Sequence, residues 1–149
     1  SLWKLLPITI DLFSAYAKYQ YYRFTLHVAH ENMDISFKNN KLKKSFNEGR
    51  QLETLHGTLR AKKIRIRMKE LRAAKNLKDF WPPESPPGRC HELTEGERSG
   101  KFHLSVDLDH PYRIIFTPNH TPMPLREEGG LDWSQVTAIT ILSVEDTHG

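Results

Sequence analysis

The sequence has almost no cysteine and no long apolar run, and both absences exclude whole classes of protein. Cys90 is the only cysteine among the 149 residues, so the chain can form neither an internal disulfide nor a zinc site of paired cysteines. No stretch reaches the roughly 18 consecutive apolar residues of a membrane-spanning helix. Nothing resembles a secretory leader with a small-residue cleavage site. We therefore expect a soluble, cytoplasmic protein without a membrane partner.

The patterns typical of nucleotide-binding and metal-binding enzymes are also missing. Neither GxGxxG nor GxxxxGK[ST] occurs, which disfavours a Rossmann or a P-loop enzyme. The eight histidines show no repeated spacing of the kind that metal ligands have. We expect neither a metal ion nor another cofactor.

The length fits one ordinary domain, but the first part of the chain differs from the rest. Residues 1–32 contain 7 of the 15 aromatic residues and no glycine or methionine, and the first methionine is Met33. We interpret residues 1–32 as a non-native or upstream-translated extension and residues 33–149 as the folded domain. The alternative is an amphipathic helical appendage. Its apolar face would carry Ile10, Phe13, Ala17 and Tyr21.

Basic residues are concentrated in the middle of the chain. The formal net charge is only +4, yet residues 38–79 hold 14 basic and 4 acidic residues, whereas residues 80–149 hold 5 basic and 11 acidic residues. This polarity fits a phosphate-rich partner or an acidic protein, and it also fits a solvated helix face. Charge alone leaves these interpretations open.

The hydrophobic pattern predicts a strand and two helices in the first half of the domain. Alternation after Met33 indicates a short opening strand. Asn39 or Asn40 is expected to cap the first helix, which would end at Gly49. A second, basic helix follows; Gly57 interrupts its beginning, and its pattern is clearest over 59–74.

The second half of the domain is predicted to be mostly strand. Four prolines within 82–87 exclude helix and central strand and indicate a rigid connector. Strands are expected over 101–108, 112–117 and 136–144. Because hairpins link them, we expect an α+β domain in which antiparallel strands form one twisted sheet, with both helices on one side.

Five short motifs together resemble the RelE/ParE toxin superfamily, and within it the HigB-type, or plasmid maintenance killer, branch. They are 71–74 (LRAA), 86–93 (PPGRCHEL), 98–100 (RSG), 111–116 (PYRIIF) and 144–148 (VEDTH). Each is short, but their order and spacing are specific, and the resemblance covers residues 33–148. The predicted order of elements also agrees with a RelE-like fold.

The resemblance implies a type II toxin that inhibits translation as a ribosome-dependent endoribonuclease acting on messenger RNA. The implied partners are the ribosome, messenger RNA and a cognate HigA-like antitoxin with a helix-turn-helix domain. One alternative is a non-catalytic binding protein of the same fold that captures a target such as DNA gyrase. Another is an attenuated toxin that binds its antitoxin and helps to regulate their operon.

Metal-independent RNA cleavage by the ribose 2′-hydroxyl needs a base, an acid and cations near the phosphorane. His91 and His148 are the candidates for acid and base, in either order, because imidazole titrates near neutral pH. Arg98 and Arg113 suit phosphate stabilisation, since a guanidinium stays charged and grips two oxygens. Asp146 could orient a histidine or accept a proton.

One of these interpretations has a structural alternative, and one position departs from the pattern of the family. Arg113 could simply pair with Asp107 or Glu145. Relatives usually carry a tyrosine at the position of Thr147, and threonine offers only a hydroxyl, so Tyr112 or another aromatic residue would have to compensate.

Further residues are predicted to contact RNA without taking part in the chemistry. Lys101 and His103 are expected on one face of a strand, opposite the apolar residues. The basic residues of the second helix would engage the ribosomal RNA backbone. They are Lys62, Lys63, Arg65, Arg67 and Lys69. Cys90 is expected to fill the core rather than to act as a nucleophile.

Overall fold

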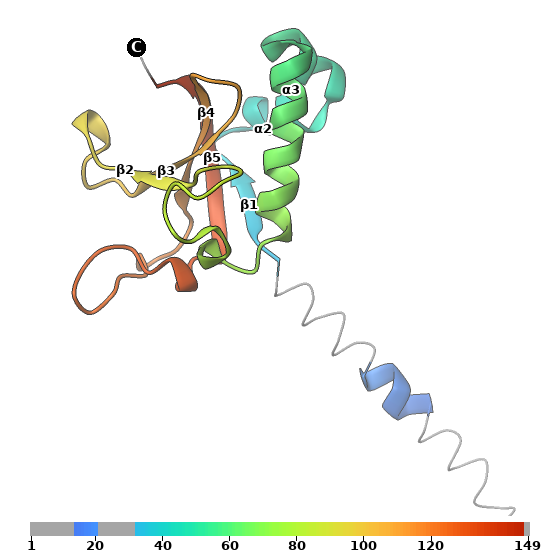
Figure 1. Cartoon of the computed structure of the whole chain (residues 1–149). Coiled ribbons are helices and arrows are strands. Elements are labelled where there is room, and N and C mark those ends of the chain that lie inside the picture. Colours follow the sequence, from blue (N-terminus) through green and yellow to red (C-terminus); the bar gives the residue numbers. More distant parts are fainter. Residues whose placement is uncertain (1–13, 21–31, 148–149) are drawn as a thin grey trace, which may run out of the picture. The chain divides into compact units, whose positions relative to one another are not determined.

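The computed structural model of the chain describes residues 14–20 and 32–147 (Figure 1). The chain divides into two units, Ser1–Glu31 and Asn32–Gly149. In the first unit, residues 14–20 are helical, and the side chains of Tyr16 and Tyr19 are exposed. Most of the apolar face proposed for a helical appendage lies outside the described residues. All elements discussed below belong to the second unit.

The second unit begins with a strand and two helices and continues with four strands. The strands are β1 (Asp34–Phe37), β2 (His91–Leu93), β3 (His103–Asp107), β4 (Tyr112–Pro118) and β5 (Ala138–Asp146). The helices are α2 (Asn40–Asn47) and α3 (Gly49–Ala73). Short 3-10 helices lie at η1 (Leu77–Phe80), η2 (Gly96–Arg98) and η3 (Trp133–Gln135).

Local sequence signals explain where the helices begin and bend. The Asn39 side chain accepts a hydrogen bond from the Leu42 amide at 2.8 Å, so the predicted N-cap is confirmed. Gly57 has φ 79° and bends α3, a conformation that a residue without Cβ adopts at little cost. The predicted end at Gly49 is wrong. Glu48 has an extended backbone that turns the chain after Asn47, and Gly49 then begins α3.

The five strands form one sheet in the order β1-β5-β4-β3-β2. The α+β class is therefore confirmed, but the sheet is mixed rather than antiparallel, because β1 runs parallel to β5. The helices α2 and α3 carry the chain between β1 and the rest of the sheet, and a crossover of this length allows parallel pairing where a hairpin does not. The short β2 was not predicted, since three residues are too few to show a period.

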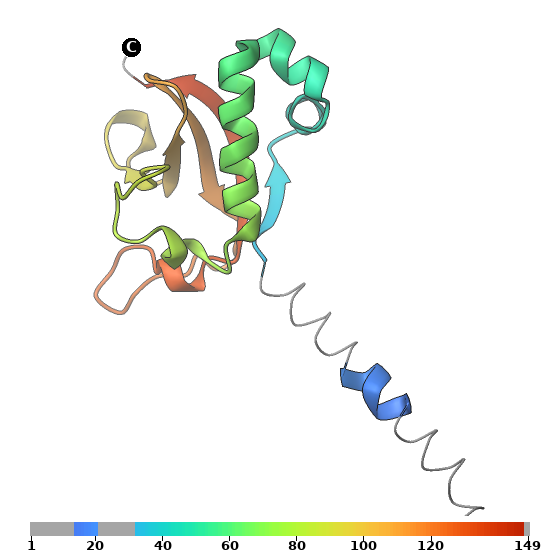
Figure 2. The same cartoon turned by 45° about the vertical axis from the view of Figure 1, so that its right-hand side comes forward.

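The two faces of the sheet have different surroundings, and α3 lies across one of them (Figure 2). We call this side the helix face and the other side the open face. The helix face contributes one apolar core together with α3. Its buried strand residues are Leu104, Val106, Ile114, Phe116, Ile139 and Ile141. Alternation along the strands places the side chains of Asp107 and Arg113 on the open face.

Candidate functional site

A depression of about 470 Å³ lies on the side of the open face. It is lined by Glu84, His91, Glu92, Leu93, Thr94, Glu95, Arg98, Arg113 and Thr147. Three of the residues predicted to be catalytic, His91, Arg98 and Arg113, line it together although they come from β2, η2 and β4. Thr147 lines the same depression. His148, the other histidine candidate, lies outside the described residues. The sheet thus brings three separate motifs of the sequence to one place.

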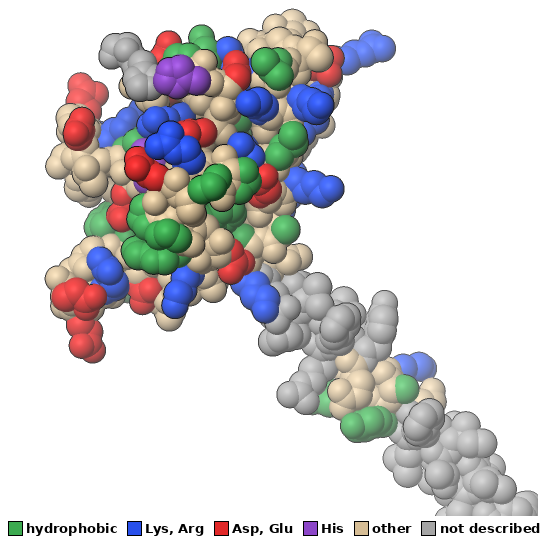
Figure 3. Space-filling view, in the orientation of Figure 1, with side chains coloured by type: hydrophobic (Ala, Val, Ile, Leu, Met, Phe, Trp, Pro, Cys, Tyr) green, Lys and Arg blue, Asp and Glu red, His purple; other side chains and the backbone are tan. Residues whose placement is uncertain are grey.

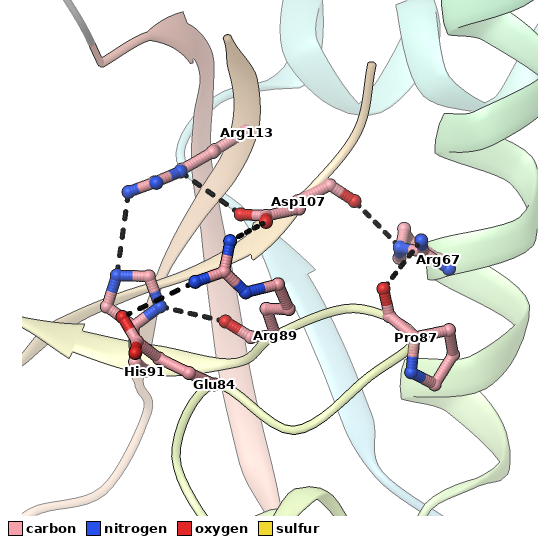
Figure 4. Close-up of polar contacts among 7 residues, drawn as sticks. All are labelled: Arg67, Glu84, Pro87, Arg89, His91, Asp107 and Arg113. Atoms are coloured by element: carbon pink, nitrogen blue, oxygen red, sulfur yellow. Dashed lines mark hydrogen bonds and ion pairs between the residues drawn. The ribbon is translucent and has the colours of Figure 1, made fainter. Parts of the chain in front are cut away.

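The contacts of the His91 ring indicate which tautomer its neutral form adopts. Nδ1 lies 2.8 Å from the carbonyl oxygen of Arg89, and since a carbonyl only accepts, Nδ1 carries the proton and donates. In the neutral ring Nε2 therefore holds a lone pair. It faces Arg113 Nη1 at 3.5 Å, at the edge of hydrogen-bond range (Figure 4). This tautomer suits His91 to accept a proton through Nε2.

Arg113 is held beside His91 by Asp107. Its Nε lies 3.1 Å from Asp107 Oδ1, and because that oxygen is buried and accepts no hydrogen bond, the contact is an ion pair and not a directed hydrogen bond. Arg89 approaches the other carboxylate oxygen at 3.6 Å and reaches Glu84 at 3.8 Å (Figure 4). Of the two alternatives for Arg113, pairing with Asp107 is therefore the one observed.

A second ion pair crosses the open face from η2 to β5. Arg98 Nη2 donates to Glu145 Oε2 at 2.5 Å, and Ser143 Oγ donates to the same oxygen at 2.7 Å. Arg98 Nη1 also lies 3.1 Å from His103 Nδ1. Since a guanidinium cannot accept, His103 Nδ1 is the acceptor and its proton is on Nε2. We call these four residues the Arg98 network.

The Arg98 network shifts two protonation equilibria. Burial lowers the pKa of His103 below the ordinary 6.5, and the positive charges of Arg98 and Lys101 lower it further, against a smaller opposing effect of Glu145. Burial alone would raise the pKa of Glu145, but hydrogen bonds from Ser143 and Arg98 outweigh burial and leave this pKa lowered. Near neutral pH the network therefore contains a neutral histidine and a carboxylate.

Other residues predicted for the site lie elsewhere. Tyr112 pairs in register with Asp146, and both belong to the side of the sheet opposite Arg113. The guanidinium of Arg60, on α3, sits 3.3 Å from the centre of the Tyr112 ring, so this ring is covered from the helix side. Lys101 lies in the turn before β3 rather than on the strand.

The basic residues of α3 divide into structural and exposed ones. Arg67 donates to the carbonyl oxygens of Asp107 and Pro87, at 2.7 and 3.1 Å, and ties the proline connector to β3 (Figure 4). Arg65 pairs with Glu53 at 3.3 Å. Lys62 and Lys69 are exposed, and Lys63 is half-buried. These residues are on the helix side, so none of them lines the depression.

Cys90 belongs to the core, where it is 1% exposed. Burial, with a smaller contribution from Glu92, raises the pKa of its thiol to about 12. A thiol that stays protonated is a poor nucleophile.

Three residues that contact the site were not assigned to it from the sequence. They are Arg89, Ser143 and Glu145, the last of which is the partner of Arg98. Strand alternation predicts that Ser143 and Glu145 share a face, because they are two residues apart, but it does not predict their contact with Arg98. The carbonyl of Arg89 leaves no signal in a sequence, since every residue has one.

Comparisons with known proteins do not assign this chain to a family, because no protein-family profile, curated protein or solved structure matches it. Within residues 14–20 and 32–147, no helix is long and apolar enough to cross a membrane. The same residues include no group of three or more His, Cys, Asp or Glu side chains that could hold a metal ion. A functional proposal for this chain therefore has to be argued from the geometry of the depression.

Proposed function

We propose that the protein is the toxin of a type II toxin-antitoxin system, a cytoplasmic, ribosome-dependent endoribonuclease that cuts messenger RNA and is neutralised by a cognate antitoxin. The observation that carries the proposal is the arrangement of His91. Its Nε2 is the unprotonated nitrogen, it faces Arg113, and Arg98 lines the same depression. A base and two cations are what metal-independent RNA cleavage requires.

In this mechanism His91 Nε2 removes the proton of a ribose 2′-hydroxyl. The 2′-oxygen then attacks the adjacent phosphorus, and the bond from phosphorus to the 5′-oxygen breaks, which leaves a 2′,3′-cyclic phosphate and a free 5′-hydroxyl. Arg113 and Arg98 stabilise the negative charge of the phosphorane. The leaving oxygen needs a proton, and His148, next to the lining residue Thr147 in the sequence, is our candidate for that acid.

Both arginines are already paired, so a phosphate must compete with Asp107 and Glu145. The Arg98 and Glu145 side chains are 28% and 39% exposed, and ion pairs open to water contribute little stability. A phosphate can therefore replace Glu145 at Arg98 more easily than Asp107 at Arg113, whose side chains are 22% and 19% exposed. The exposed Lys62 and Lys69 of α3 would serve the ribosome, since phosphate contacts need charge and not a fixed geometry.

The test is induced expression of the full chain, with new 5′ ends mapped on cellular messenger RNA. We expect growth arrest and codon-positioned cuts. His91→Ala should reduce cleavage by about 100- to 10,000-fold, the usual contribution of a general base, and Arg98→Ala and His148→Ala should also reduce it. His110→Ala is the matched control, because His110 is exposed and does not line the depression.

Arg98 and Arg113 are both paired with carboxylates. This pairing favours one other candidate function, a non-catalytic binding protein of the same fold. Its target would be a protein such as DNA gyrase, or the antitoxin alone in operon regulation. Arrest that persists in His91→Ala and produces no new 5′ ends would support the gyrase-type target. Absence of arrest would support the attenuated toxin.

A further inference from the structure

A second pocket, of about 260 Å³, lies between η1 and the segment that leads into η3. It is lined by Lys78, Trp81, Arg126, Leu131, Asp132, Trp133 and Ser134. None of these residues lines the depression of the open face. Figure 3 shows hydrophobic side chains gathered on the lower part of the domain, with Lys and Arg side chains beside them. The nuclease mechanism above assigns no role to this pocket.

Two tryptophans form the apolar part of this pocket. Their ring centres are 5.2 Å apart and their planes are perpendicular. The edge of one ring therefore meets the face of the other, and the two rings are not stacked. Trp133 is 3% exposed, whereas Trp81 is 49% exposed. A half-exposed indole at the mouth of a pocket offers a surface on which another flat ring can stack.

The indole N–H of Trp133 is buried and has no hydrogen-bond partner among the described residues. An indole nitrogen can only donate, and a buried donor without an acceptor is unfavourable. The group is covered by protein atoms, so a ligand reaches it only if the side chains around it move. A ligand with a carbonyl or ring-nitrogen acceptor would then satisfy it.

The polar part of the pocket has two cations, Lys78 and Arg126, and one carboxylate, Asp132. The Asp132 carboxylate already accepts hydrogen bonds from the amide and hydroxyl of Ser134, at 3.1 and 2.6 Å. Lys78 is exposed. Arg126 has only a 3.7 Å contact with the exposed Glu128, which a stronger anion can replace.

The Arg126 guanidinium lies over the turn from Arg126 to Gly130. The Arg126 amide donates to the Gly130 carbonyl at 2.9 Å, and a Cβ at Gly130 would lie 2.9 Å from Arg126 Nη2. Gly130 has a φ of 83°, a conformation that glycine favours.

We propose that this pocket binds one unpaired base of a single-stranded RNA, with Lys78 and Arg126 on the flanking phosphates. The identity of that RNA as the substrate rests on the proposed nuclease function. Stacking on an aromatic ring beside cations is how proteins bind single strands. The volume is below the roughly 300–1,000 Å³ of pockets for drug-sized ligands, which fits a single base. An aromatic side chain of a peptide would occupy the ring space but leave both cations unmatched.

The test measures binding of fluorescently labelled hexauridylate by anisotropy, with the full chain carrying His91→Ala so that RNA is not cut. Trp81→Leu should weaken binding about tenfold or more, the usual cost of losing one stacked base, while Trp81→Phe should keep most of the affinity. Lys78→Gln should lower the slope of log affinity against log salt by about 1. Leu125→Ala is the control, since Leu125 is 53% exposed on the same segment and does not line the pocket.

An unchanged dissociation constant in Trp81→Leu would overturn the base pocket. So would an equal loss in Leu125→Ala, or binding of an aromatic peptide that depends on Trp81 while RNA binding does not. If Trp81→Leu does not fold, two results are still required. Trp81→Phe must keep most of the affinity for the RNA, and Lys78→Gln must lower the salt slope. Cleavage that survives His91→Ala would contradict the nuclease mechanism. An affinity for RNA that depends on Trp81 would still support the base pocket, so the two proposals can fail separately.

Discussion

The two faces of the sheet have the same strands but opposite chemistry. On the helix face, residues such as Ile114 and Phe116 are fully buried against α3. On the open face, the neighbouring positions of the same strand carry Arg113, Thr117 and, between them, Ile115, which is also fully buried. The helix α3 covers one face, and the ion pairs of Arg98 and Arg113 lie on the other.

This difference separates stability from chemistry within single strands. Apolar burial against α3 supplies the main driving force for folding, at about 25 cal/mol for each Å² removed from water. The open face holds charged groups whose pairing is worth much less. Side chains of the open face can therefore change their partners without unfolding the domain, which a binding site for phosphate requires.

The largest effect should come from removing a core side chain of the helix face. Phe116→Ala should lower the free energy of unfolding by about 3–5 kcal/mol, because it leaves a cavity at a fully buried position. Its neighbour on the open face, Thr117→Ala, should cost about 1 kcal/mol, for the lost hydrogen bond of 3.2 Å to the Phe102 carbonyl. Urea denaturation of both variants measures the contrast. Similar losses would show that the faces do not differ in this way.

A smaller effect is expected from the ion pair beneath His91. Asp107→Asn leaves Arg113, whose side chain is only 19% exposed, without its counter-charge, and should lower the free energy of unfolding by about 1–3 kcal/mol. The matched control is Glu53→Gln, which breaks an exposed pair with Arg65 and should change stability by less than about 1 kcal/mol. Equal effects in urea denaturation would mean that the open face holds Arg113 no more tightly than a surface pair.

Much of this comparison could be predicted from the sequence. Alternation over 101–108 separates Leu104 and Val106 from His103 and Asp107, and the structure places these residues on opposite faces as expected. The cap at Asn39 and the break at Gly57 were likewise readable, because each depends on a residue type with a local effect. Local chemistry and strand period are the parts that a sequence displays directly.

The parts that could not be predicted depend on contacts between distant residues. Parallel pairing of β1 with β5 joins positions about a hundred residues apart, and no local pattern encodes that choice. The same is true of Arg98 and Glu145, which are brought together by the order of four strands. The sequence predicts Arg98 as a cation for phosphate, but its pairing with the Glu145 carboxylate can be identified only in the folded chain.

The smallest effect, and the finest test of the open face, is the titration of His103. Arg98→Gln removes a positive charge that lowers the His103 pKa, so this pKa should rise towards 6.5, whereas Glu145→Gln removes the opposing carboxylate and should lower it further. Because the folded-state pKa lies below that of the unfolded chain, protonation favours unfolding, and the contribution of neutral His103 to stability is lost as the pH falls from 6.5 through the lower folded-state pKa. Ring resonances followed by NMR from pH 4 to 8 would report both shifts. The two variants remove charges of opposite sign, so shifts in the same direction would show that Arg98 and Glu145 do not act on His103 mainly through their charges.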